Sequence, residues 1–234
     1  GVEGCALRLP TPTAFHTATV LDHGDIVVVG GVEFDDISQT LITTRQVLVV
    51  RFTGQDTAFI EQITPETGSS ASRAMHTATV VEPGRIAIIG GVSQTLDNPL
   101  YVAPIDEVTI SADGGTVSYQ STGFALQTAR ALHSAEFFSV GGHGILVAGG
   151  RTADAVLSST EVVFYDNGWG VEAGDSLATA RYAAAATTYA CPTAPGVGYY
   201  ALAGGFTAVT GTNPLSGGLP TASVEVYDPN PFAE

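Results

Sequence analysis

The sequence predicts an all-β protein made of four copies of one antiparallel unit, and three observations lead to this expectation. One phrase recurs along the 234 residues: a small, β-branched run, then an apolar run that ends in two glycines. The first glycines of these pairs are evenly spaced, at Gly30, Gly90, Gly149 and Gly204. No stretch carries a sustained helical period of apolar residues. A long and regular period indicates one supersecondary unit that is repeated along the chain.

The first two strands of each unit are predicted from its opening residues. In the first copy, 17–20 is a run of threonine, alanine and valine, and 26–29 is an apolar run, with Asp22-His-Gly-Asp25 between them. Two β-rich runs that are joined by a tight glycine turn are typical of an antiparallel hairpin. The pair Gly30-Gly31 then marks a bend where backbone must approach backbone closely.

A third and a fourth strand complete the unit after a loop of variable length. Third strands are predicted at 47–52, 108–110, 162–165 and 224–227. Fourth strands are predicted in three copies, near 59–63, 116–120 and 169–172. Four antiparallel strands per unit, repeated, are the pattern of a propeller blade. We therefore expect one propeller domain over 1–234, with blade repeats at about 13–69, 70–127, 128–180 and 181–234.

The unit resembles the kelch repeat, whose hallmarks are an Arg-x-x-His opening, a glycine pair after the second strand and Tyr-Asp after the third. Two copies open with Arg73-Ala-Met-His76 and Arg130-Ala-Leu-His133. The other copies keep one half of this motif each, Arg181 with Ala184 and His16 with Thr13. Further matches are Tyr165-Asp166, Tyr227-Asp228 and the fourth-strand residue Trp169. The resemblance spans essentially the whole chain and implies a kelch-type β-propeller.

The last copy ends after three strands, and we expect the N-terminal strand 1–9 to close it. Residues 1–12 precede Thr13 much as 169–180 precede Arg181. Pairing this strand into the last blade would remove an open edge and tie the termini together. The result would be four blades of four strands. Two other arrangements remain open: the chain is part of a larger ring, or two chains associate to close one ring.

Acidic residues dominate the charge of the chain. There are 23 aspartates and glutamates against 8 arginines, with no lysine, and the net charge is −15. Such a chain repels nucleic-acid phosphates and anionic membrane surfaces, so we expect neither as a partner. No apolar run approaches the ~20 residues that a membrane span needs, so we expect no membrane insertion.

Cys5 and Cys191 are the two cysteines of the chain. The expected closure places both in the last blade, Cys5 in the closing strand and Cys191 after the first strand of that copy. A bond between them would constrain a loop of nearly the whole chain, whereas the alternative is two buried thiols. We predict the disulfide, and with it a secreted, periplasmic or cell-surface location.

Three histidines at equivalent positions, His16, His76 and His133, are the candidate metal ligands. Around a common channel, imidazoles from successive blades would suit zinc or a similar ion. We favour the alternative that they hydrogen-bond between blades, and so we predict no cofactor. Glu136 replaces a threonine of the other copies, which indicates a buried ion pair or a functional acid in the channel. The repeated arginines 73, 130 and 181 need carboxylate or carbonyl partners if they are buried.

The loops after the glycine pairs differ most between copies, and the individuality of a repeat protein lies in such loops. They carry the candidate binding residues Phe34, Asp35, Asp36, Asp97, Tyr101 and Phe206. No serine-hydrolase elbow, phosphate loop or zinc-protease motif is present in the sequence. We therefore expect a non-enzymatic binding or scaffold module that presents loops on one propeller face to a protein partner. The alternatives are a carbohydrate-binding propeller, and an enzyme or metal-binding protein with a His/Glu site at the channel mouth.

Overall fold

The computed structural model describes residues 7–53, 57–111, 115–139, 143–165, 168–190 and 198–227. Every regular element within these ranges is a β-strand, as the sequence predicts. The described part of the chain accordingly has no helix that is long and apolar enough to cross a membrane.

The strands form four main antiparallel sheets, which we number along the chain. Sheet one contains β1 (Thr17–Val20), β2 (Ile26–Val29), β5 (Val47–Phe52) and β6 (Ala58–Gln62). Sheet two contains β7 (Thr77–Glu82), β8 (Arg85–Ile89), β11 (Pro104–Ile110) and β12 (Val117–Ala125). Sheet three contains β13 (Ser134–Phe138), β14 (Gly144–Ala148), β15 (Thr160–Phe164) and β16 (Gly170–Gly174). Sheet four contains β17 (Ala185–Ala190), β18 (Gly198–Ala203) and β19 (Val224–Tyr227).

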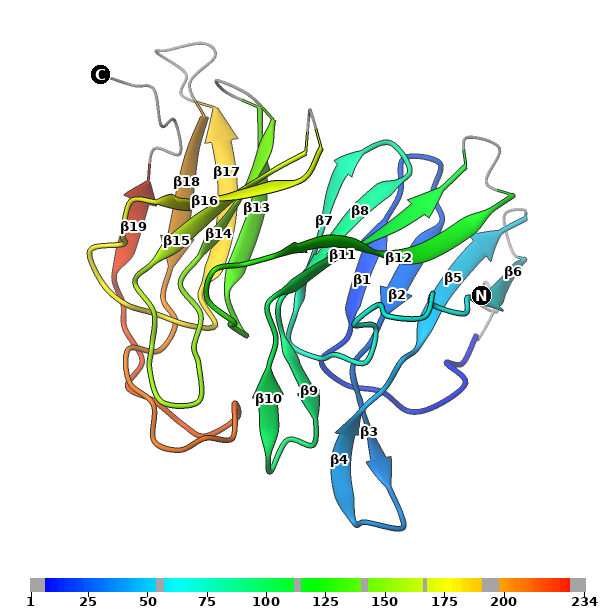
Figure 1. The fold of residues 1–234 in the computed structure, drawn as a ribbon, viewed down its shortest axis with the longest axis horizontal. Coiled ribbons are helices and arrows are strands. Elements are labelled where there is room, and N and C mark those ends of the chain that lie inside the picture. Colours follow the sequence, from blue (N-terminus) through cyan, green and yellow to red (C-terminus); the bar gives the residue numbers. More distant parts are fainter. Residues whose placement is uncertain are drawn as a thin grey trace, which may run out of the picture.

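Two short hairpins occupy segments that the sequence analysis treated only as loops. They are β3 (Val32–Asp35) with β4 (Thr40–Thr43), and β9 (Val92–Gln94) with β10 (Pro99–Tyr101). Each follows a glycine pair directly. Both project from the same end of the molecule, at the bottom of Figure 1.

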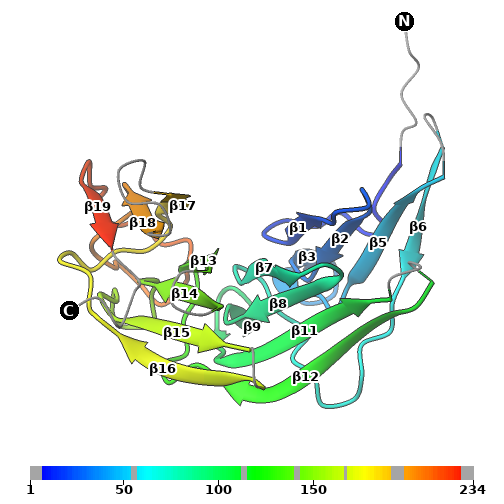
Figure 2. The same ribbon diagram turned by 90° about the horizontal axis from the view of Figure 1, so that it is seen from above.

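The four sheets stand side by side in an open arc (Figure 2). The first strands β1, β7, β13 and β17 lie along the concave side, and β6, β12 and β16 lie along the convex side. The closed four-bladed ring that we expected is not seen. Within the part of the chain that the structure describes, sheet four has three strands, and residues 7–13 form no strand against it. They are tied instead to the first copy, where the Thr11 hydroxyl donates to Gln46 Oε1 at 3.2 Å.

Apolar side chains fill the spaces between successive sheets and form the core. Because successive residues of a strand face opposite ways, Ile86 and Ile88 of β8 pack toward sheet one, whereas Ala87 and Ile89 pack toward sheet three. Leu146 of β14 likewise packs against Leu202 of sheet four. Each fully buried aliphatic side chain contributes about 1.5–3 kcal/mol. Both faces of the central strands are buried. This explains why these strands are continuous apolar runs in the sequence.

Candidate functional site

The junction between two sheets is built from the glycine pair of one copy and the opening residues of the next. The second glycine donates its N–H to an arginine carbonyl at 2.8 Å in three junctions: Gly31 to Arg73, Gly91 to Arg130 and Gly150 to Arg181. A Cβ on Gly90 would lie 2.6 Å from the Arg130 carbonyl oxygen, and one on Gly30 would come closer still to that of Arg73. The repeated glycines therefore allow the backbones of adjacent sheets to touch.

A second row of backbone bonds links the residues that precede the repeat histidines. Phe15, Met75, Leu132 and Ala183 all have a left-handed backbone, with φ between 53° and 57°. Met75 N–H donates to the Phe15 carbonyl, Leu132 N–H to that of Met75, and Ala183 N–H to that of Leu132. The left-handed conformation costs about 1–2 kcal/mol for a residue with a side chain. These hydrogen bonds between sheets offset part of that cost.

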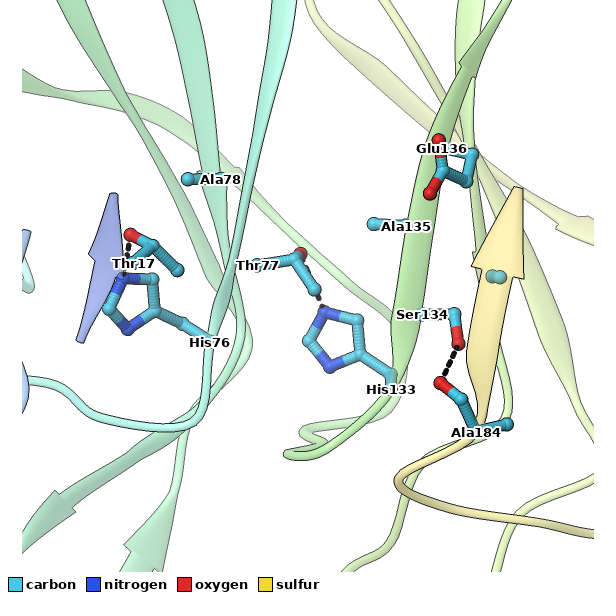
Figure 3. A pocket seen from close by; sticks show the side chains of 10 residues that line it. Thr17, His76, Thr77, Ala78, His133, Ser134, Ala135, Glu136 and Ala184 are labelled. Carbon is cyan, nitrogen blue, oxygen red and sulfur yellow. Dashed lines mark hydrogen bonds between the residues drawn. The ribbon is translucent and has the colours of Figure 1, made fainter. Parts of the chain in front are cut away.

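His76 and His133 belong to these junctions (Figure 3). His76 Nε2 hydrogen-bonds Thr17 Oγ1 at 3.0 Å, and His133 Nε2 hydrogen-bonds Thr77 Oγ1 at 2.9 Å. Both histidines are buried. Burial lowers the pKa of His76 well below its usual value and, with the charge of Arg130 adding to the effect, lowers the pKa of His133 to about 3. Both rings are therefore neutral at physiological pH.

The three repeat histidines do not gather into a metal centre. His76 and His133 each bond a threonine of a different sheet, whereas His16 directly precedes β1, and no described sheet comes before sheet one. Across the described ranges, no group of three or more His, Cys, Asp and Glu side chains is arranged to hold a metal ion.

The third junction lacks the histidine and uses a shorter contact. Ala184 stands at the histidine position, and Ser134 stands where sheets one and two have Thr17 and Thr77. The Ser134 hydroxyl donates directly to the Ala184 carbonyl at 3.2 Å (Figure 3). Alanine in place of histidine and serine in place of threonine are therefore compatible changes. With the imidazole ring absent, the smaller hydroxyl side chain bonds the backbone of the next sheet.

The repeated arginines are buried and paired within their own copies, as expected of buried charges. Their partners come from the third strands: Arg73 with Asp106 at 2.6 Å, Arg130 with Glu161 at 2.6 Å and Arg181 with Glu225 at 3.3 Å. In the first copy, Thr13 and a buried leucine, Leu48, occupy both positions. The charged pair is thus either complete or replaced at both positions, as the cost of a lone buried charge requires.

Glu136 lies on β13, and the buried ion pair, one of the two roles expected for it, is not seen among the described residues. No hydrogen bond or ion pair joins its carboxylate to another described residue. Burial raises its pKa, and the side chain is half-buried. Tyr200 lies close by, and burial, reinforced by the charge of Glu136, raises the pKa of its hydroxyl.

A pocket of about 280 Å³ opens on the concave side around this glutamate. Its walls come from β1, β7, β13 and β17 and the residues just before them (Figure 3). The lining residues are Thr17, His76, Thr77, Ala78, His133, Ser134, Ala135, Glu136, Ala184 and Ala186. Glu136 is the one acidic group in this lining, and the two histidines are already hydrogen-bonded to threonines.

The loops that follow the glycine pairs are joined to one another at the end of the molecule shown at the bottom of Figure 1, which we call the loop end. The two hairpins touch, since Leu96 N–H donates to the Leu41 carbonyl at 3.0 Å. Arg151 is fully buried and donates to the carbonyls of Asn213 and Gly211. Its guanidinium also lies over the Tyr182 ring, 5.5 Å from the centroid. The loop end is therefore one braced surface built from loops of several copies.

The predicted binding residues all lie at the loop end, but they differ in exposure. Phe34 is 55% exposed, and Asp36 and Asp97 are exposed as well. Asp35 instead shapes its turn, because it accepts hydrogen bonds from Ser38 and from the Ile37 N–H that lower its pKa.

The other two predicted aromatic residues make internal contacts. The Tyr101 hydroxyl donates to the Thr212 carbonyl at 3.3 Å. The Phe206 ring stacks on Tyr182 with 5.3 Å between centroids. Both side chains therefore help to hold the loops in place.

The aliphatic residues at the loop end were missed by the sequence analysis, which considered aromatic and acidic side chains. Ile37, at the tip of the first hairpin, is 95% exposed, and Leu100, Leu215 and Leu219 are also exposed. Each is a large apolar side chain between polar or turn-forming neighbours, and that was the signal available in the sequence.

Several predicted features fall on residues that the structure does not describe. Cys5 and Cys191, proposed as a disulfide, lie outside the described ranges. The same holds for Asp166 and Asp228 of the Tyr-Asp pairs, and for the start of the proposed closing strand.

No protein-family model matches the chain, and no curated protein is similar enough to count as a relative.

Proposed function

We propose that the four sheets are blades of a kelch-type propeller and that the chain is a non-enzymatic binding module whose loop end docks a protein partner. The observation that carries this proposal is the set of exposed aliphatic and aromatic side chains on loops that are braced against one another. Phe34 and Leu100 lie on the hairpin strands β3 and β10, Ile37 lies at the tip of the first hairpin, and Leu215 and Leu219 lie on the loop after the fourth glycine pair.

The contacts between the loops favour binding, because a rigid surface loses little conformational entropy when it binds. The buried Arg151 and its bonds to Gly211 and Asn213 fix the loop that carries Leu215. The contact between Leu96 and Leu41 fixes the two hairpins relative to each other. Exposed apolar groups on such a surface are typical of protein–protein contacts.

Charge narrows the class of partner. Asp36 and Asp97 are exposed beside the apolar residues of the hairpins, and the whole chain carries a net charge of −15. Complementary potentials speed association and disfavour wrong partners. We therefore propose a protein partner whose contact surface has an apolar centre and a basic rim.

The test compares variants of the loop end after a captured protein has been identified and purified. The double change Ile37→Asp and Leu100→Asp is expected to raise the dissociation constant by about tenfold or more, since hot-spot residues dominate such contacts. The matched control is Phe59→Asp, an exposed apolar residue on β6 near the opposite end of the molecule. Equal binding by both variants would contradict the proposal. Glycan binding that depends on Phe34 would favour the carbohydrate alternative.

We also propose that Cys5 and Cys191 form a disulfide and that the protein works in an oxidising compartment. A peptide map without reductant is expected to show the two cysteines in one linked pair. Two thiols that react with an alkylating agent in the folded, unreduced protein would refute this.

A further inference from the structure

The two ends of the arc expose the two halves of the junction that joins the sheets inside it. Each internal junction pairs the glycine-pair side of one sheet with the opening side of the next. Among the described residues, no sheet follows the glycine-pair side of sheet four, and none precedes the opening side of sheet one (Figure 2).

The first of these exposed junction halves is the glycine-pair side of sheet four. A Cβ on Gly30, Gly90 or Gly149 would collide with the backbone of the following copy, whereas a Cβ on Gly204 would meet nothing closer than Thr221 of its own copy, at 3.6 Å. Gly205 corresponds to Gly31, Gly91 and Gly150, but its N–H bonds no following copy among the described residues.

Side chains of sheet four are also left exposed on this side. Val224 and Val226 of β19 are 65% and 54% exposed. The strand pairing places them at the positions of Val47 and Val49 in sheet one, which are fully buried against sheet two. β19 thus carries a core pattern on a face that nothing described covers.

Sheet one presents the complementary half. Val20 of β1 is 64% exposed, although its equivalents Val80 and Phe137 pack against the sheet before them. The Phe15 N–H has the place in its copy from which Met75, Leu132 and Ala183 donate to the preceding copy. The Ala183 carbonyl, at the other end of the arc, is the corresponding acceptor in the last copy.

We propose that sheet four of one chain docks head to tail on sheet one of a second copy, by the same junction that joins the sheets within the chain. The contact is heterologous, and the curvature of the arc favours closure of a ring over growth of a filament. The backbone bonds, from Gly205 N–H to the Thr13 carbonyl and from Phe15 N–H to the Ala183 carbonyl, need no particular side chains.

Side chains make this junction weaker than the internal ones. Ala185 stands at the position where Thr17 and Thr77 hydrogen-bond the histidine of the next copy, so His16 would find no hydroxyl there. The charge of −15 on each chain also opposes association. We therefore expect reversible association that strengthens when salt screens the repulsion.

Sedimentation velocity of the wild-type chain over a range of concentrations tests the proposal. A closed, salt-strengthened assembly of a fixed number of chains is expected. A monomer at hundreds of micromolar and high salt overturns the proposal.

Two single variants then test the arrangement. Val20→Glu and Val226→Glu change exposed residues at opposite ends of the arc, so each is expected to fold, as a wild-type-like thermal transition would show. Each is expected to weaken association by about tenfold or more, because a charge would be buried without a partner. An equimolar mixture is expected to regain association, since it contains one intact pair of ends. A mixture that associates no better than either variant alone contradicts the head-to-tail contact.

The control is Ile37→Asp at the loop end, which is expected to associate like the wild type. This control also separates the inference from the proposed function, because the loop-end variant is expected to fail only in partner binding and the arc-end variants only in self-association.

Discussion

Glycine at the end of the second strand shows how one residue type sets the distance between sheets. Gly90 has φ +62°, and its hydrogen atom points at the backbone of the next copy. The same contact recurs at Gly30 and Gly149. The regular spacing of the glycine pairs led to the prediction of a repeat. The spacing is regular because each of these junctions requires a glycine. Which carbonyl each glycine meets could not be predicted, because that depends on how sheets far apart in the sequence pack.

The change Gly90→Ala is expected to destabilise the protein by about 2–4 kcal/mol, because the new Cβ adds a steric clash to a left-handed backbone. The clash is with the Arg130 carbonyl oxygen at 2.6 Å and His133 Cε1 at 2.8 Å. The matched control is Gly68→Ala, where φ is +93° but nothing lies within 4 Å, so only the cost of the backbone conformation remains. Urea unfolding measures both changes. Equal losses for the two variants would mean that the close approach at Gly90 contributes nothing.

The buried histidines make stability depend on pH in a definite direction. The pKa of His133 is about 3 in the folded protein, below its ordinary value of 6.5. Unfolding therefore takes up a proton between these values, and stability falls as pH falls through this window, by up to about 1.4 kcal/mol per pH unit for this residue. His133→Gln keeps a hydrogen-bonding side chain and removes the titration. Unfolding free energies between pH 4 and 7 are expected to vary less in this variant than in the wild type. The same slope in both proteins would contradict the neutral, buried state of this ring.

At the scale of elements, each copy is built on one antiparallel sheet, and in the last three copies an arginine–carboxylate pair links the opening residues to the third strand. The strands at 17–20, 26–29 and 47–52 were predicted with the bounds that the structure shows. The hairpins at 32–43 and 92–101 were not, because their tips are polar and their strands are short. The alternation in Val32-Glu-Phe-Asp35 was nevertheless a signal for a strand.

The first copy has neither the arginine nor the carboxylate. This suggests an experiment on the Arg130–Glu161 pair of the third copy. Arg130→Thr alone is expected to cost about 3–5 kcal/mol, because it leaves the Glu161 carboxylate buried without its cation. Adding Glu161→Leu reproduces the Thr13 and Leu48 combination and is expected to recover part of that loss, although the Glu161 bonds to Gln127 N–H and Thr128 N–H are also removed. Thermal or urea unfolding of the single and double variants gives the comparison. A double variant that is less stable than Arg130→Thr would contradict this view of the pair.

At the scale of the whole molecule, the open arc is the feature that the sequence could not reveal. Counting strands favoured closure by residues 1–9, whereas residues 7–13 lie against the first copy, held by Thr11 and Gln46. Closure depends on curvature, which arises from side-chain volumes between sheets and is not written in any local motif. The candidate site shows the same limit. Phe34 and the loop acids were proposed as binding residues from the sequence, but the contacts of Arg151 that hold the loops depend on how distant copies pack.

The central claim is that one junction repeats along the arc and is left incomplete at its ends. Amide hydrogen exchange at the four equivalent glycines, Gly31, Gly91, Gly150 and Gly205, tests it most directly. In a monomeric Val20→Glu sample, the first three amides are expected to be protected and Gly205 to exchange rapidly. In the concentrated wild type, Gly205 is expected to become protected too. Equal protection of all four amides in the monomer would contradict the claim, because it would mean that a single chain completes its own last junction.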